Sequence, residues 1–356
     1  MNQITQIPVT VITGFLGSGK TTLLSSILKK KELQKTAVII NEFGEIGLDH
    51  ALIEHTDENI VELQSGCICC TIQGDLNKTL IDLFEKMMNG KVSSFNRILI
   101  ETTGLANPVP IIHTLMSSIE LIRIYSLDGV ITVVDSANGE KTLDLHEESL
   151  KQLALAEKII LSKTDIVDKD EIKSLVYRIK EINPVSQIIF SKFGNIPLEE
   201  IFGLGAYDPY KKSADVKNWL AAEKYKDKKH HHHHHHHHDV NRHNENIRAF
   251  SMMSENPVNM IAFSFFRDMI TAALGANLLR MKGIVNIAGE ERPAVIHGVQ
   301  HIFHPVQWLE TWPDNDRRTK LVFITQNIKK EQIEDFFRPL MGLDTEEGLP
   351  KEIFEI

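Results

Sequence analysis

Short apolar runs rich in β-branched residues alternate with longer amphipathic segments from Val9 to about Gly205. The short runs predict buried strands, and the longer segments have the spacing of helices. Strands that alternate with helices favour right-handed βαβ units, so the pattern predicts an α/β fold with a mainly parallel, doubly wound sheet covered on both faces. The predicted strands are Val9–Thr13, Ala37–Asn41, Ile60–Leu63, Ile98–Glu101, Val130–Asp135, Lys158–Ser162 and Gln187–Ser191; the predicted helices are Thr21–Lys31, Asp75–Asn89, Pro108–Ser118, Glu147–Ala156 and Asp170–Ile182.

A second, smaller domain is predicted beyond a polar segment that ends the first domain, residues 1–205. Residues 206–246 are polar and charged and cannot bury a core, so we expect a flexible linker there. Apolar periodicity returns in residues 247–342 and predicts an α+β domain with a mostly antiparallel sheet, for which a ferredoxin-like topology is one candidate. Residues 343–356 are a tail without a clear pattern. The predicted strands are Ile247–Met252, Gly283–Ala288, Ala294–Val299, His301–Trp308 and Lys320–Thr325, and the predicted helices are Asn259–Leu274 and Lys330–Met341.

Composition and charge narrow the classes of protein that fit this pattern. The 356 residues, 42% of them apolar, are enough for two packed cores. The formal net charge of −9 argues against a general nucleic-acid binder. There is no basic leader followed by an apolar stretch and no apolar run long enough to cross a bilayer. We therefore expect a cytoplasmic protein with no membrane partner.

The segment Gly14–Thr21, with the sequence GFLGSGKT, fits the phosphate-loop pattern G-x-x-x-x-G-K-[ST]. It follows an apolar strand and opens a helix, which is the context the motif requires. Its glycines let successive N–H groups point inward, Lys20 reaches the β- and γ-phosphates, and the Thr21 hydroxyl can ligate Mg²⁺. The predicted phosphate-binding residues are Gly14, Gly17, Ser18, Gly19, Lys20, Thr21 and Thr22, of which Lys20 and Thr21 are also predicted to act in catalysis.

Glu101 ends an apolar strand, as does the acidic residue that holds Mg²⁺ or its water shell in other phosphate-loop proteins. We predict that it assists catalysis together with Lys20 and Thr21. Gly104 lies three residues further on and can offer its backbone N–H to the γ-phosphate. A contact with the γ-phosphate disappears on hydrolysis, so this segment is a candidate nucleotide switch.

The choice of base depends on Ser162, Lys163 and Asp165, which follow another predicted strand. A carboxylate at Asp165 can accept both in-plane donors of guanine, and the Lys163 stem can lie along the ring. The sequence therefore favours GTP over ATP. The usual guanine signature begins with Asn, and the shorter Ser162 supplies no amide.

All three cysteines lie between Cys67 and Cys70, in the sequence CICC. This clustering gives no disulfide framework but suits a thiolate metal site in a reducing compartment. Two or three of the sulfurs, with Glu42, Glu45 or a histidine completing the shell, would suit tetrahedral Zn²⁺, and Co²⁺ could occupy the same geometry. The alternative is that Cys67, Cys69 and Cys70 are small buried apolar residues. Because ligands collect at the carboxyl edge of a parallel sheet, these segments and the phosphate loop should share one edge.

Nine consecutive histidines occupy the predicted linker. Weak, interchangeable imidazole sites would raise the local concentration of Zn²⁺, Co²⁺ or related ions with little discrimination between them. An introduced affinity tag is the alternative reading. The nine residues are His230, His231, His232, His233, His234, His235, His236, His237 and His238.

These motifs together resemble the CobW-like metallochaperone GTPases, relatives of the nickel-insertion GTPases of urease and hydrogenase maturation. The resemblance covers most of the chain, and the CxCC segment inside a phosphate-loop domain is its specific part. It implies slow GTP hydrolysis coupled to delivery of a transition metal, usually zinc and in some members cobalt, to a metal-requiring client protein. Matching positions imply that Lys20 and Thr21 hold phosphate and Mg²⁺, Glu42 lies in the first switch, and the three cysteines form the cargo site.

Two other classes of protein fit the same residues. A phosphate-loop kinase or other NTPase with structural cysteines would transfer phosphate without metal-dependent switching. A metal buffer with a vestigial nucleotide site would bind metal equally well with GTP, GDP or neither. The sequence is compatible with a homodimer and does not identify the residue that activates the hydrolytic water.

Overall fold

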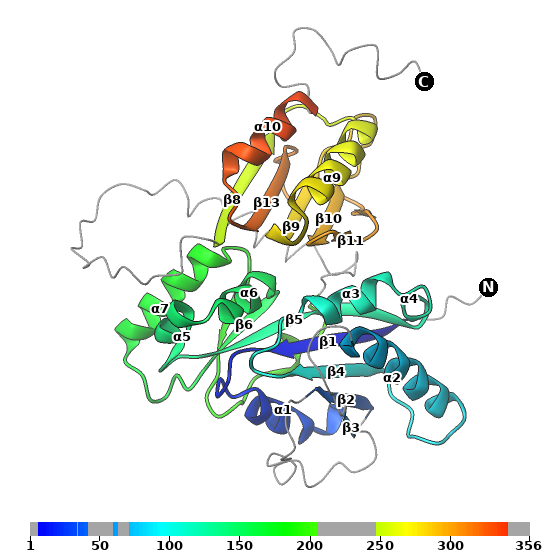
Figure 1. Cartoon of the computed structure of the whole chain (residues 1–356), viewed down its shortest axis with the longest axis vertical. Helices are drawn as coiled ribbons and strands as arrows, with labels where there is room; N and C mark the ends of the chain where they lie inside the picture. The colour runs from blue at the N-terminus through cyan, green and yellow to red at the C-terminus, as the bar shows by residue number, and fades with distance from the viewer. Residues whose placement is uncertain (1–5, 34, 42–59, 63–70, 205–246, 341–356) are drawn as a thin grey trace. The chain divides into compact units, whose positions relative to one another are not determined.

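The structure is a computed structural model that describes residues 6–33, 35–41, 60–62, 71–204 and 247–340. The chain divides into two compact units. The first unit contains strands β1 to β7, and the second contains strands β8 to β13 (Figure 1). Among the described residues, no helix combines the length and the apolar character that crossing a membrane requires.

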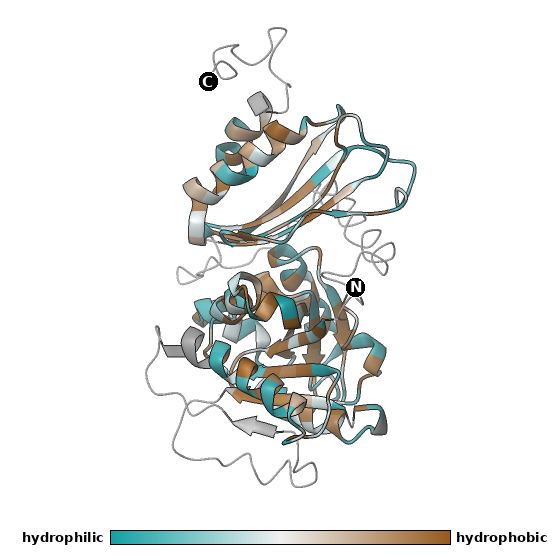
Figure 2. Ribbon diagram, turned by 90° about the vertical axis from the view of Figure 1, so that its right-hand side faces the viewer, coloured by the Kyte–Doolittle hydropathy of each residue, from teal (hydrophilic) through white to brown (hydrophobic). Residues whose placement is uncertain are grey.

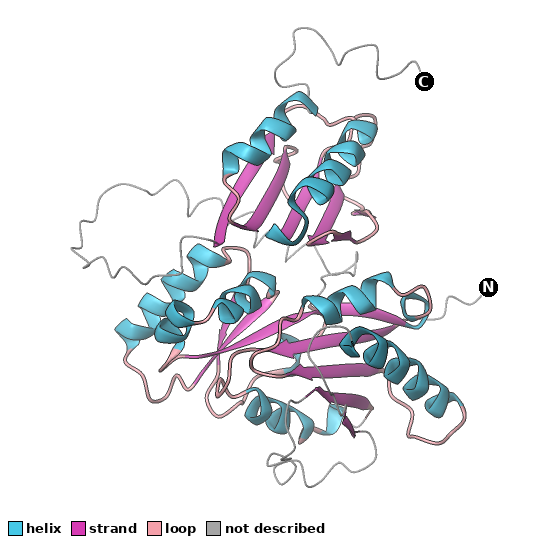
Figure 3. Cartoon of the chain, viewed as in Figure 1, coloured by secondary structure: helices cyan, strands magenta, loops and turns pink. Residues whose placement is uncertain are grey.

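A single seven-stranded sheet forms the centre of the first unit, in the order β3-β2-β4-β1-β5-β6-β7. All six neighbouring pairs are parallel, as the alternation of strands and helices predicts. Figure 3 shows the strands beside the helices that connect them. The strands are β1 (Ile7–Thr13), β2 (Thr36–Asn41), β3 (Ile60–Glu62), β4 (Arg97–Thr102), β5 (Tyr125–Asp135), β6 (Lys158–Ser162) and β7 (Gln187–Phe190).

The strands of this sheet are buried on both faces, which explains their nearly continuous apolar runs. Val11 and Ile12 are neighbours that point to opposite faces, and both are fully buried. Helix α1 covers the Ile12 face through Leu23 and Ile27. Strands of this unit are largely apolar in Figure 2. The helices are α1 (Lys20–Leu28), α2 (Thr71–Met88), α3 (Val109–Ser117), α4 (Leu121–Ile124), α5 (Gly139–Leu145), α6 (Glu147–Leu155) and α7 (Lys169–Ile182).

The second unit is an antiparallel sheet with two helices. Strand β13 lies between β8 and β9 and is antiparallel to both, so β8, α9 and β9 form a βαβ unit with a gap between its strands. Strand β10 pairs with the other side of β9 and also with β11 and β12. The elements are β8 (Ile247–Ser254), α9 (Met260–Leu274), β9 (Leu278–Val285), β10 (Ala294–Val299), β11 (Ile302–Phe303), β12 (Gln307–Trp308), β13 (Thr319–Gln326) and α10 (Lys330–Leu340).

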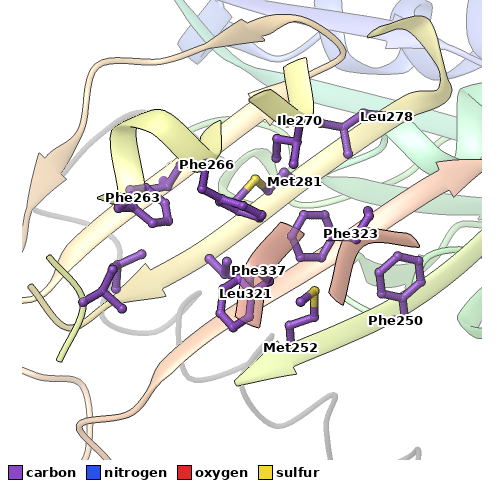
Figure 4. Packing of buried hydrophobic residues seen from close by; sticks show 14 of the residues in the cluster. Phe250, Met252, Phe263, Phe266, Ile270, Leu278, Met281, Leu321, Phe323 and Phe337 are labelled. Atoms are coloured by element: carbon purple, nitrogen blue, oxygen red, sulfur yellow. The ribbon is translucent and has the colours of Figure 1, made fainter. Parts of the chain in front are cut away.

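Aromatic side chains from both helices meet the sheet in one apolar core (Figure 4). Phe266 of α9 and Phe337 of α10 pack edge to face with ring centroids 5.4 Å apart. Phe250 and Phe323 stack on neighbouring strands at 5.5 Å. This cluster fixes both helices on the same face of the sheet, as expected for an α+β domain.

Three sequence predictions for this unit were wrong in detail. The predicted strand at Gly283–Ala288 lies earlier, at β9, where every residue is buried, including Arg280 at 3% exposure. The predicted strand His301–Trp308 is divided into β11 and β12, with Pro305 between them, because proline lacks the N–H that a ladder needs. The ferredoxin-like topology is also wrong. Strand β10 pairs with the outer side of β9, and the position between β8 and β9 is filled by β13.

Candidate nucleotide-binding site

The site lies at the carboxyl edge of the seven-stranded sheet. Strands β1 to β4 are parallel, so their carboxyl ends lie at the same edge, and the phosphate loop and the segment after Thr102 both start from it. Asn41 of β2 is in register with Thr102 of β4. The predicted metal ligands that follow β2 and β3 lie outside the described residues; they are Glu42, Glu45, Cys67, Cys69 and Cys70.

The phosphate loop has the backbone conformation that its glycines permit. Gly14, Gly17 and Gly19 have φ angles of 145°, 72° and 94°, which side chains rarely adopt. A Cβ at Gly14 would also lie 2.3 Å from the Val133 carbonyl oxygen. Gly19 is the N-cap of α1 and provides no side-chain cap. No capping side chain therefore competes with an anion at the positive end of α1.

The side chains of Lys20 and Thr21 contact different parts of the site. The Lys20 side chain is buried at 8% exposure, and its Nζ donates to the Phe15 carbonyl oxygen at 3.2 Å, so it bends back over the loop. Thr21 Oγ1 donates to Glu101 Oε1 at 3.1 Å. Two oxygens at this separation suit adjacent positions around octahedral Mg²⁺, whose ligands lie about 2.1 Å from the metal. The residues fit the predicted Mg²⁺ site, and their role as ligands stays a prediction.

The segment after β4 lies directly on the phosphate loop. A Cβ at Gly104 would lie 2.6 Å from the Leu16 nitrogen and 2.7 Å from the Leu16 Cα. At such distances only glycine fits without moving one of the two backbones. Beneath this contact, Thr102 Oγ1 donates to Thr13 Oγ1 at 2.8 Å and joins the ends of β4 and β1. A shift of the phosphate loop must therefore displace the segment that contains Gly104.

Ser162 connects the predicted base-binding segment to the phosphate loop. Its Oγ lies 2.6 Å from the Ser18 carbonyl oxygen and 3.2 Å from that of Val134, so it can donate to either. The hydroxyl thus has a structural partner where the usual motif has an amide. Lys163 adopts a left-handed φ of 57°, and Asp165 is exposed. Their contacts with a guanine base stay predictions.

Sequence reasoning did not identify Asp135, the last residue of β5, as part of this site. Its carboxylate accepts from Lys163 Nζ at 2.7 Å, from Asn138 Nδ2 at 2.9 Å and from the Ala137 N–H at 2.8 Å. Burial alone would raise the pKa of Asp135, but the hydrogen bonds from Asn138 and Lys163 outweigh it and lower that pKa. The ion pair fixes the Lys163 stem. The available signal was a carboxylate at the end of a predicted strand, the same signal that identified Glu101.

Replacing Asp135 with asparagine tests this anchor. We expect nucleotide affinity to fall roughly fivefold, because about 1 kcal/mol of charge-assisted hydrogen bonding is lost. The ionised carboxylate contributes stability above its ordinary pKa of about 4, and this contribution is lost as the pH falls through the lowered native value. The difference in unfolding free energy between wild type and Asp135→Asn should therefore be constant near neutral pH and shrink below about pH 4.

Urea titrations at a series of pH values measure this difference. The control is Asp168→Asn, at an exposed position before α7. A wild-type advantage over Asp135→Asn that stays the same at every pH would contradict the role of the ionised carboxylate.

The histidines give no metal centre within the described ranges. Among the described residues, no group of three or more His, Cys, Asp or Glu side chains could hold a metal ion. His297, His301 and His304 therefore form no such group. His304 donates its backbone N–H to the His297 carbonyl oxygen, so the two are close in the fold for a structural reason. The tract His230–His238 lies outside the described residues.

A parallel sheet with this loop, and with Glu101 beside Thr21, defines a phosphate-loop nucleotide-binding protein. Residues 8–190 match the CobW/HypB/UreG nucleotide-binding domain, and residues 247–340 match the cobalamin synthesis protein cobW C-terminal domain. The chain belongs to the CobW family of phosphate-loop GTPases, which confirms the resemblance inferred from its motifs.

Several relatives match almost the whole chain. Zinc chaperone YjiA of Escherichia coli is 32% identical over 94% of this chain and 98% of its own length. Zinc-regulated GTPase metalloprotein activator 1 of Dictyostelium discoideum is 31% identical over 98% of this chain and 82% of its own length. The crystal structure of Zn(II)-bound YjiA GTPase from E. coli matches with a TM-score of 0.70 at 27% identity, covering 95% of this chain and 99% of that one. A Zn(II)-bound triple mutant of YjiA, with one glutamate and two cysteines replaced by alanine, gives 0.72 at the same identity.

Proposed function

We propose that this protein hydrolyses GTP and uses the nucleotide state to control the delivery of Zn²⁺ to a metal-requiring client protein. The observation that carries the proposal is the backbone contact between Gly104 and Leu16. It joins the phosphate loop to a segment whose strand, β4, pairs directly with β2. The names of the zinc chaperone and GTPase relatives support both the metal and the hydrolysis.

We assign residues within the described ranges to binding of the phosphates, Mg²⁺ and the guanine base. Lys20 and the N–H groups at the start of α1 bind and stabilise the phosphates, while Thr21 and Glu101 hold Mg²⁺. Lys163 and Asp165 bind guanine, with Lys163 held by Asp135. Mg²⁺ supplies charge neutralisation at the phosphates. With no side chain assigned to activate the attacking water, we expect slow turnover until a partner binds.

The cargo site is proposed at Cys67, Cys69 and Cys70, with Glu42 or Glu45 completing the shell. The strands before these segments, β2 and β3, end at the same sheet edge as the phosphate loop. If GTP and metal bias the same segments, each must change the affinity of the other by the same factor. Loss of the γ-phosphate then weakens the thiolate site and releases the metal. The tract His230–His238 collects metal ions and raises their local concentration.

The cargo assignment is tested with Zn²⁺ titrations of the full chain in competition with a chromogenic chelator. We compare wild type, Cys67→Ser/Cys69→Ser/Cys70→Ser, and a deletion of residues 230–238. The expected result is loss of the tightest site only in the cysteine variant and loss of weaker sites only in the deletion. Affinities must be measured, because the alanine variant of YjiA still holds zinc. A tight site that survives in the cysteine variant would show that the thiolates are structural.

A further inference from the structure

We propose that Gln152 is a positioning residue that holds the segment Thr103–Ala106 against the phosphate loop and thereby sets the preference for GTP over GDP. The inference rests on the proposed function and on the predicted contact between the Gly104 N–H and the γ-phosphate. It assigns the control of this contact to a side chain on α6, which neither the motifs nor the related proteins' names identify.

Within the described residues, the side-chain amide of Gln152 donates to this segment only. Gln152 is fully buried, and its Nε2 donates to the Gly104 carbonyl oxygen at 3.2 Å and to the Ala106 carbonyl oxygen at 3.0 Å. Both amide protons are therefore used, and two carbonyl acceptors fix which end of the amide faces the segment. The backbone carbonyl oxygen of Gln152 accepts from Thr132 Oγ1 at 2.7 Å, so the residue is itself attached to β5.

Helix α6 also meets the phosphate loop at its start. His146, the residue before α6, stacks on Phe15 with ring centroids 4.3 Å apart and an interplanar angle of 28°. The helix thus contacts the loop through His146 and the Gly104 segment through Gln152. It connects the phosphate loop to the segment whose Gly104 N–H is predicted to contact the γ-phosphate.

The oxygen atom of the Gln152 side-chain amide indicates that this residue does more than fill space in the core. Among the described atoms, Gln152 Oε1 is buried without a hydrogen-bond partner. Gln152 also lines a cavity of about 220 Å³, together with Leu16 and Ser149. A buried acceptor without a partner lowers stability. An apolar side chain would avoid this loss but would leave the Gly104 and Ala106 carbonyls without their donors.

Two substitutions separate positioning from packing. Gln152→Leu keeps a similar volume and removes both donors, so affinity for a hydrolysis-resistant GTP analogue should fall about tenfold, or about 1.4 kcal/mol, while GDP affinity stays within about twofold. Gln152→Glu places a carboxyl group against two carbonyl oxygens, which favours its protonated form. Protonation restores one donor, so GTP-analogue affinity of this variant should recover as the pH falls from about 8 to about 6.

The measurement is isothermal titration of the full chain with the GTP analogue and with GDP, in Mg²⁺ and at each pH. Gln187→Leu is the matched control, because Gln187 is exposed at the start of β7. Equal losses of GTP-analogue and GDP affinity in Gln152→Leu, or a Gln152→Glu variant with the pH profile of wild type, would overturn the proposal. If Gln152→Leu does not fold, the pH profile of Gln152→Glu decides. A wild type that binds both nucleotides equally would instead contradict the proposed function itself.

Discussion

Replacing Lys20 with alanine is expected to slow GTP hydrolysis by about 10²- to 10³-fold, the size of effect seen when one preorganised electrostatic group is removed from an active site. The Lys20 side chain is buried and already folded over the phosphate loop, where Nζ donates to the Phe15 carbonyl oxygen. A charge held there needs little reorganisation when negative charge develops on the transferred phosphoryl group. Single-turnover hydrolysis with excess enzyme measures the chemical step.

The control is Lys29→Ala, which removes an exposed lysine at the other end of α1. It should leave the rate within about twofold of wild type, since exposed charges far from the phosphates contribute little. A Lys20→Ala enzyme that hydrolyses GTP at nearly the wild-type rate would show that this loop does not hold the reacting phosphates.

Replacing Gly104 with alanine is expected to lower the hydrolysis rate by about 10²-fold, because a displacement of the order of 1 Å at a catalytic site has effects of this size. The new Cβ would meet Leu16 backbone atoms at 2.6 and 2.7 Å, so the segment or the loop must move. GDP affinity should change by no more than about twofold, since the proposed contact is with the γ-phosphate that GDP lacks. Stopped-flow nucleotide binding and single-turnover hydrolysis measure both quantities.

Leu105→Ala is the matched control for this substitution. Leu105 is 54% exposed, and its truncation brings no atom toward the phosphate loop. If Gly104→Ala hydrolyses GTP as fast as Leu105→Ala, the Gly104 segment is not the switch. A parallel loss of GDP affinity would place the effect on the loop as a whole rather than on the γ-phosphate contact.

The phosphate loop could be predicted from sequence because its conformation is determined locally. Three glycines supply the positive φ angles, and the neighbouring strand and helix follow from short-range patterns. The shared edge of Thr21 and Glu101 followed from the parallel sheet, which the alternation of strands and helices predicts. These inferences need only the order of elements and not the packing of particular side chains.

Asp135 and Gln152 could not be assigned in this way, because their partners are distant in sequence. Asp135 is separated from Lys163 by 28 residues, and Gln152 is separated from Gly104 by 48. A single Gln in an amphipathic helix carries no signal until the tertiary structure places two carbonyl groups beside it. In the second unit, buried charged residues such as Arg280 interrupt the apolar pattern, so this pattern did not predict the start of β9.

The most direct test of the account is the Zn²⁺ affinity of one protein preparation in two nucleotide states. Chelator competition is performed with Mg²⁺ and either a hydrolysis-resistant GTP analogue or GDP, on wild type and on Cys67→Ser/Cys69→Ser/Cys70→Ser. We predict that wild type binds Zn²⁺ about 10²-fold more tightly in the GTP-analogue form, within the usual range of coupling between two sites, and that the cysteine variant shows no such difference. Equal Zn²⁺ affinity of wild type in the two states would contradict nucleotide-controlled delivery.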